Sequence, residues 1–450
     1  MSVFRPSPVL LLAGLVLIGL ALRAGLQTVR SADLTIDRDA YLGIATALKT
    51  TGVYATPNSN QPTAFRPPLY PLLLATISRA LPLALTVAVI NLASAALTIG
   101  GTYLLARELG LKSGALLAAA WVTFDPLLLW SAKDAMTEGL FTGLLTLTLW
   151  LTVRWLHAPS WPLALTTGLT VAATSLCRPT LLPWNLYWLG LFVVAVGSPS
   201  LRSRHHPWQA AAILLLVSGT LSLWGLRNLD QLGHFIPTTT HGGYTLLLGN
   251  NPVFFREVVQ GPPGATWSYD SLTQWQADLH RQQQADLALQ AKDEVAVDRW
   301  CNQRARQWIS NHPQQFLTAC LYRLQALWSL GPRGPESASL PTVVRLGISA
   351  FYAIWFTAAA WGLIILVRQN HWSPQAWAPW IPLLLWAAVL CTVHLFYWTD
   401  TRMRAPLHPV LACLAAIPLS QYLQSRQNRD NSSKSGHNSS ASEHIPSTKK

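Results

Sequence analysis

Long apolar runs separated by short polar connections dominate the chain from residue 8 to residue 423. Each run approaches the roughly 20 residues that an α-helix needs to cross about 30 Å of hydrocarbon. The pattern predicts about ten transmembrane helices, at residues 8–27, 83–105, 113–130, 137–154, 161–177, 181–198, 209–226, 343–367, 376–397 and 405–423. We therefore expect an all-α polytopic membrane protein with one membrane domain over residues 1–424.

Two segments between the predicted spans are long and polar, residues 28–82 and 227–342. Long ordered loops more often carry function than short connectors do. Within the second segment, residues 274–308 predict one solvated helix, and residues 316–328 predict an apolar stripe along the membrane interface. Residues 425–450 are rich in Ser, Asn and Lys, and we expect them to form a disordered cytoplasmic tail.

Basic residues in the short connections predict the orientation of the chain. Arg107, Arg154, Arg368 and Arg426 fall on one side when the N-terminus is cytoplasmic, as the positive-inside rule requires. The arginines of residues 28–82 favour the opposite orientation, but that segment is near the length at which the rule stops governing translocation. We keep the orientation on which the later connections agree, which places both long segments outside the cell.

Composition supports a membrane protein and argues against several other classes. Hydrophobic residues make up 51% of the chain, only 11% are charged, and Trp occurs 21 times. The net charge of +13 would suggest a nucleic-acid partner in a soluble chain, but these charges lie in membrane connections. We expect membrane lipids and no nucleic acid as partners. The cysteines have no metal-ligand spacing, so no metal or other cofactor is indicated, and Cys301 and Cys320 could form a disulfide.

The stretch "TIDRDAYLGIA" places acids directly after the first predicted span. Apolar residues recur at helical spacing from Tyr41 to Leu48, so Asp37 lies near a helix start, where free backbone N–H groups favour a carboxylate. Asp37 could be a helix cap or a functional acid, and Asp39 could equally be the cap.

Further charged residues fall near the outer ends of predicted spans. Glu138 begins one span, and an acid at that depth must be paired or reach water, which makes it a candidate second acid. Four arginines could bind a lipid phosphate there, or could instead reach out to headgroups: Arg66, Arg178, Arg402 and Arg404.

Several motifs in order resemble the family 39 type of membrane glycosyltransferases. They are "IATALKTTGVY" (44–54), "RPPLYPLLLA" (66–75), "DAMTEGLF" (134–141), "SLCRPTLLP" (175–183), "LRNLDQLGHFIPTTTHGGYTLLLGNNP" (226–252) and "TDTRMRAPLHPVL" (399–411). This family includes protein O-mannosyltransferases and transferases that place aminoarabinose on lipid A. The resemblance implies a class C glycosyltransferase fold, a catalytic carboxylate in the first external loop, and a sugar on a polyprenyl phosphate as donor.

The resemblance also suggests roles for particular residues. Family members usually read Asp-Glu-x-x-Tyr where this chain has Asp37, Arg38 and then Tyr41, so the catalytic acid falls on Asp37 and the following Glu is missing. The resemblance suggests substrate contacts from Tyr41, Tyr70, Asn250 and Asn251.

These observations favour an integral membrane glycosyltransferase in the plasma (inner) membrane with its active site facing outside. Asp37 would accept the proton of a glycan, lipid or protein acceptor, and arginines would stabilise the departing phosphate. Two alternatives stay open: a secondary transporter, which the position of the charges at span ends disfavours, and a noncatalytic partner in an envelope glycan pathway, which Arg38 would suit.

Overall fold

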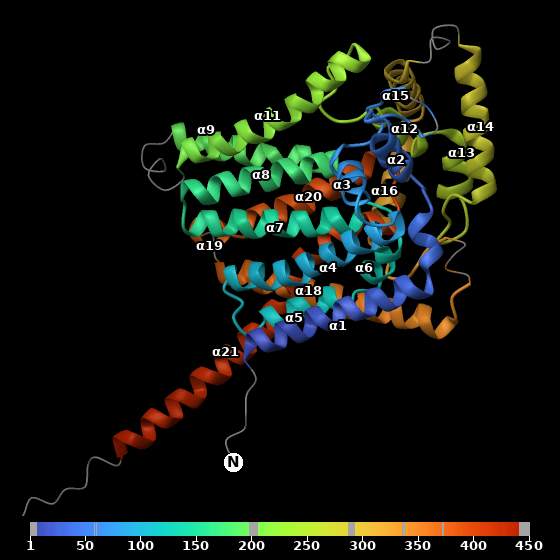
Figure 1. The fold of residues 1–450 in the computed structure, drawn as a ribbon. Coiled ribbons are helices and arrows are strands. Elements are labelled where there is room, and N and C mark those ends of the chain that lie inside the picture. The colour runs from blue at the N-terminus through green and yellow to red at the C-terminus, as the bar shows by residue number, and fades with distance from the viewer. Residues whose placement is uncertain are drawn as a thin grey trace, which may run out of the picture.

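The computed structural model describes residues 7–57, 59, 61–197, 206–286, 293–334, 337, 339–370 and 373–440. In this part of the chain the regular structure is helical, apart from one isolated β-bridge between Ala55 and Pro62. Figure 1 shows a bundle of long helices with a cap of shorter helices at one end. The all-α prediction is therefore confirmed.

Seven helical segments are long and apolar enough to cross a membrane. They are α1 (Pro8–Val29), α4 (Leu83–Glu108), α7 (Glu138–His157), η3 (Pro179–Asn185) continued by α9 (Leu186–Gly197), α11 (Pro207–Leu232), α18 (Thr342–Asn370), and η6 (Thr401–Leu407) continued by α21 (His408–Ser440). Their exposed large apolar side chains are those expected of a surface that faces lipid.

The remaining three predicted spans are irregular or short. Helices α5 (Ala115–Thr123) and α6 (Pro126–Trp130), the latter followed by η2 (Ser131–Lys133), cover one predicted span with a bend of 48° between them. Asp125 explains the break, because its carboxylate caps α6 by accepting from the Leu127 and Leu128 amides at 2.7 and 3.0 Å. Helices α8 (Trp161–Cys177) and α20 (Ile381–Phe396), which follows α19 (Pro374–Trp377), are shorter and run beside the long helices (Figure 1). Each predicted span therefore corresponds to a helix or a pair of helices.

The cap is built from the two long polar segments. The first contains η1 (Ser31–Thr35), α2 (Tyr41–Thr51) and α3 (Leu69–Ile77). The second contains α12 (Gly242–Leu248), α13 (Pro252–Phe254), η4 (Phe255–Val259), α14 (Tyr269–Ala285), α15 (Glu294–Asn311) and α16 (Pro313–Leu327). Both lie at the same end of the bundle (Figure 1).

Hydrogen bonds tie the two segments together. The Glu294 carboxylate of α15 accepts from the Thr63 hydroxyl at 2.6 Å and from the Ala64 amide at 2.7 Å. Arg227 of α11 donates to the carbonyl oxygens of Thr63 and Tyr54, at 2.7 and 2.9 Å. Tyr54, Thr63 and Ala64 are thus fixed to the second segment although more than 160 positions separate them from their partners in the chain.

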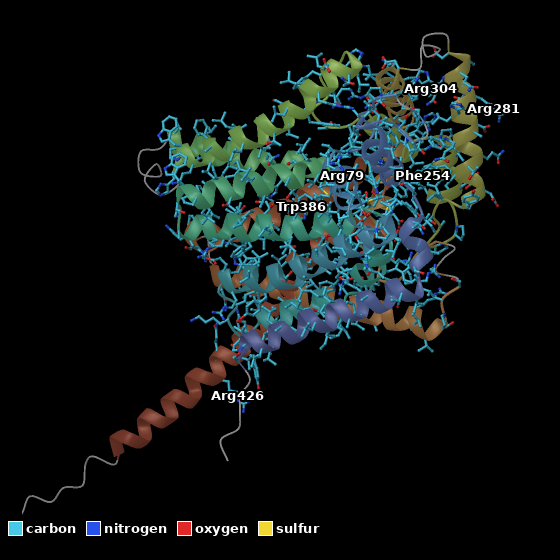
Figure 2. All side chains as sticks on the ribbon, in the orientation of Figure 1. Arg79, Phe254, Arg281, Arg304, Trp386 and Arg426 are labelled. Carbon is cyan, nitrogen blue, oxygen red and sulfur yellow. The ribbon has the colours of Figure 1, made fainter. Side chains whose placement is uncertain are left out.

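Aromatic residues fill much of the bundle interior. The Trp386 side chain is fully buried, lies 5.8 Å from the Phe141 ring, and donates from its indole nitrogen to the Pro406 carbonyl at 3.2 Å. Figure 2 shows Trp386 within the bundle, whereas Arg281 and Arg304 lie in the cap. Packing of this kind joins α7, α20 and η6 just below the cap.

The structure corrects two expectations outside the bundle. The helix predicted over residues 274–308 is two helices, α14 and α15. Cys301 and Cys320 are both free thiols, so the suggested disulfide is wrong. Helix α21 continues to Ser440 and residues 441–450 lie outside the described part, so the disordered tail over residues 425–450 stays a prediction.

Candidate active site

A cavity of about 1240 Å³ opens where the cap meets the bundle. Its floor is apolar and includes Phe141, Leu182, Leu390 and Val393 from the ends of the membrane helices. Its walls come from both long segments, η3 and η6. Five of the residues singled out from the sequence line it: Asp37, Tyr41, Arg66, Arg178 and Arg402.

Asp37 presents an exposed carboxylate to this cavity. Its two oxygens accept from the backbone amides of Leu42 and Gly43 in the first turn of α2, at 3.1 and 2.7 Å. Ala40 turns the chain into the helix with a left-handed backbone (φ 64°), which is uncommon for a residue other than glycine. The expected helix-start position is thus correct for Asp37, and the amides fix the direction of its carboxylate.

Asp39 does not cap the helix but pairs with Arg66 at 2.9 Å. The Arg66 side chain also donates from Nε to the Asp39 carbonyl at 2.7 Å, and its guanidinium lies 5.2 Å from the centre of the Tyr41 ring. This arrangement accounts for the arginine before Pro67, because it joins the entry of α2 to the turn before α3. Arg66 lines the cavity as an already paired cation.

Arg178 and Arg402 form a second charged wall around Glu138. The Glu138 Oε1 atom lies 3.2 Å from Arg178 and 3.7 Å from Arg402, and the glutamate is only 2% exposed. Glu138 itself does not line the cavity, whereas both arginines do. The predicted second acid therefore lies behind the two arginines, where one negative charge orients two positive ones.

Two of the other expected site residues are buried away from the cavity. Arg404 is 1% exposed and donates to the backbone carbonyls of Leu327 and Ser329, so it holds the backbone here, and its contact with a phosphate stays a prediction. Tyr70 is fully buried and meets the Tyr41 ring edge-on at 5.3 Å, so it supports Tyr41 from behind.

The side chains of Asn250 and Asn251 also form hydrogen bonds with the backbone. Asn250 donates from its amide to the carbonyls of Leu246 and Phe396, both at 2.7 Å, and Asn251 caps α13 by accepting from Phe254 at 2.8 Å. Neither asparagine is among the described residues that line the cavity. In this structure the amides hold the turn between α12 and α13, and the suggested sugar contacts stay a prediction.

The fold and this cavity can now be compared with known proteins. The sequence matches no family model and no curated protein. Among solved structures, the archaeal oligosaccharyltransferase AglB from Archaeoglobus fulgidus, in complex with an inhibitory peptide and a dolichol-phosphate, aligns with 98% of this chain at 14% identity and a TM-score of 0.50. Its apo form aligns with 94% at 13% identity and a TM-score of 0.51. The chain has the class C glycosyltransferase fold.

The similarity to this class C fold extends over almost the whole chain but only 52% of AglB, so the chain spans about half the length of that structure. A weaker likeness is to ArnT from Cupriavidus metallidurans bound to undecaprenyl phosphate, over 92% of this chain and 77% of ArnT, at 13% identity and a TM-score of 0.38. With its apolar helices, the chain is a multi-pass membrane protein.

The cavity residues that sequence reasoning did not single out include His241 and Asp298. His241 stacks on Tyr244 with ring centres 5.1 Å apart, and burial together with Arg66 lowers its pKa well below the usual value. Asp298 accepts from the Gly243 amide at 2.6 Å, and burial raises the pKa of its carboxyl. The spacing of Glu294 and Asp298, one helical turn apart, is the signal that could have revealed this wall.

Proposed function

We propose that this chain is an integral membrane glycosyltransferase that moves a sugar from a polyprenyl-phosphate carrier to an acceptor hydroxyl. One observation carries the proposal: a carboxylate, Asp37, and two adjacent cations, Arg178 and Arg402, line the same cavity above an apolar floor. The dolichol-phosphate in the AglB complex supports a carrier of this chemistry, because that enzyme shares the fold.

The reaction follows from these groups. The acceptor oxygen attacks the anomeric carbon of the donor, and its proton passes to the Asp37 carboxylate. The bond between the anomeric carbon and the phosphate oxygen breaks, and the polyprenyl phosphate leaves with the electron pair. Arg178 and Arg402 stabilise the charge that gathers on that phosphate, while Leu390 and Val393 contact the first part of the prenyl chain.

We place the cavity on the outer face of the plasma (inner) membrane. Arg107, Arg154 and Arg368 end helices at the opposite end of the bundle, which the positive-inside rule assigns to the cytoplasm. A cysteine replacing Tyr269, which is 82% exposed on α14, should react with an impermeant maleimide on intact cells. Labelling only after the cells are permeabilised would reverse this orientation.

The transfer activity is tested with purified protein and a radiolabelled lipid-linked sugar pool. Asp37→Asn keeps the size of the side chain and one of its two hydrogen-bond acceptors but cannot take the proton, so transfer should fall at least 100-fold at normal expression. Asp270→Asn, a change in the first turn of α14 away from the cavity lining, should retain the wild-type rate. Equal rates for wild type and Asp37→Asn would refute the proposal. Asp37-independent counterflow of a solute would favour a transporter.

A further inference from the structure

The cavity wall formed by the second long segment differs from the wall around Arg178. Helix α14 turns one face to the cavity, with Leu272, Gln276, Leu279, His280 and Gln283 at helical spacing. Helix α15 adds Glu294 and Asp298 beside it. Figure 1 shows α14 at the outer edge of the cap.

Among the described lining residues, permanent positive charge lies on the other side of the cavity. All four arginines among its lining residues come from the first segment or from span ends: Arg38, Arg66, Arg178 and Arg402. Among the described residues of 227–342, the cavity lining includes acids but no Arg or Lys. Arg281 is exposed and pairs with Asp278, and Arg304 donates to Gln282 at 2.8 Å. Figure 2 shows Arg281 on the outer side of α14.

The α14–α15 wall carries amide, carboxyl, imidazole and aromatic groups. Gln276 donates to the Tyr244 hydroxyl at 2.7 Å, and Gln283 lies 3.6 Å from the Cys301 sulfur, which places both amides at the cavity surface. Amides and carboxylates can exchange several hydrogen bonds with hydroxyl groups, and the Tyr244 and Trp267 rings offer flat apolar faces. These are groups suited to a molecule that is rich in hydroxyls and has no net negative charge.

We infer that the α14–α15 wall is the acceptor subsite and that the acceptor is an uncharged glycan. This inference rests on the proposed function. An anionic acceptor would meet Glu294 and Asp298, and among the described residues of this wall no Arg or Lys lines the cavity beside them. A peptide commonly adds main-chain hydrogen bonds to a sheet edge, and this wall is helical, with its backbone groups already paired. A lipid acceptor would need the apolar floor, on which the prenyl carrier lies in our proposal.

The class of acceptor is tested by where the label goes. Membranes of the host are supplied with a radiolabelled lipid-linked sugar, together with one of three fractions from a deletion strain: neutral envelope polysaccharide, envelope protein or extractable lipid. We expect Asp37-dependent label in the neutral polysaccharide, resistant to protease and insoluble in chloroform–methanol. Label in protease-sensitive or lipid-extractable material would overturn the inference while leaving the proposed function intact. No Asp37-dependent transfer to any fraction would overturn the proposed function, and the inference with it.

The location of the subsite is tested separately with paired variants. Gln276→Ala combined with Gln283→Ala should raise the KM for the neutral polysaccharide fraction at least tenfold and leave the KM for the lipid-linked donor unchanged. Gln274→Ala is the matched control, because this glutamine is exposed on α14 but does not line the cavity. An unchanged acceptor KM in the double variant, with normal protein levels, would contradict the assignment.

Discussion

Backbone amides in the first turn of α2 hold the Asp37 carboxylate in the cavity. The Gly43 amide holds one carboxylate oxygen, and this glycine also packs closely against Pro57. A Cβ atom at position 43 would overlap the Pro57 ring and lie 3.2 Å from Asp37 Oδ2. The lack of a side chain at Gly43 therefore helps to set the direction of the Asp37 carboxylate.

Replacing Gly43 tests this positioning. Gly43→Ala should push Pro57 or the start of α2 aside and lower the transfer rate at least tenfold, because misplacing a proton acceptor by about 1 Å is costly. The rate is measured with the lipid-linked sugar assay, and Gly25→Ala is the control, since no atom lies within 4 Å of a Cβ built there. A normal rate for Gly43→Ala would show that the carboxylate tolerates movement.

In our proposal Glu138 acts indirectly, because it holds Arg178 and Arg402 in place. Glu138→Gln removes the charge that holds Arg178 and Arg402 together, and we expect the donor KM to rise about tenfold, equivalent to roughly 1.4 kcal/mol. Glu108→Gln is the control, because Glu108 pairs with Arg154 at the opposite end of the bundle. A fall in rate with an unchanged donor KM would instead assign Glu138 a direct part in the chemistry.

His241 should make the stability of the folded protein depend on pH. Burial and Arg66 lower its pKa in the folded protein, so folding favours the neutral ring. Stability from this group is present above the unfolded pKa near 6.5 and is lost as the pH falls below it. Thermal unfolding in detergent should therefore show a larger drop in Tm from pH 7.5 to pH 5 for wild type than for His241→Asn. The exposed His280→Asn should follow wild type, and equal drops for all three proteins would contradict this role.

At the scale of the elements, α15 joins the two long segments. Glu294 accepts from Thr63 and Ala64 of the first segment and from Thr240 of its own segment, and Asp298 one turn later accepts from the start of α12. One face of α15 therefore holds both the first segment and the α12 wall in place.

The effect of Glu294 is local to the cap. Glu294→Ala removes acceptors for the Ala64 amide and two hydroxyls, so hydrogen exchange should speed up at least tenfold in residues 61–66 and 238–245. Exchange within α4 and α7 should stay as in wild type. Glu257→Gln, a partly exposed acid on η4, is the control. Unchanged exchange around Ala64 would mean that other contacts are sufficient.

Elements of the cap were harder to predict than spans because tertiary contacts decide them. The start of α2 was readable from Asp37 and the helical spacing after it. The break between α14 and α15 was not, since Gln, Ala and Arg favour a continuous helix on both sides of it. Asn250 and Asn251 lie in the same motif as residues of the cavity wall, and only the fold shows that their amides hold a turn.

At the scale of the whole molecule, apolar run length was sufficient to predict the bundle. A membrane forces backbone groups to pair within helices, so each long run has essentially one structure. The run lengths do not predict which charged residues meet, because Glu138 begins α7, Arg178 lies between α8 and η3, and Arg402 belongs to η6. Their convergence depends on how the helices pack, and similar arginines at span ends, such as Arg404, face backbone carbonyls instead.

The most direct test of the account is a structure by electron cryomicroscopy of the protein in nanodiscs with added undecaprenyl phosphate. We predict density for a phosphate within hydrogen-bond distance of Arg178 and Arg402, with the prenyl chain leaving over Leu390 and Val393 and with Asp37 facing the same cavity. A phosphate bound elsewhere on the protein, while this cavity remains empty at saturating lipid, would contradict the account.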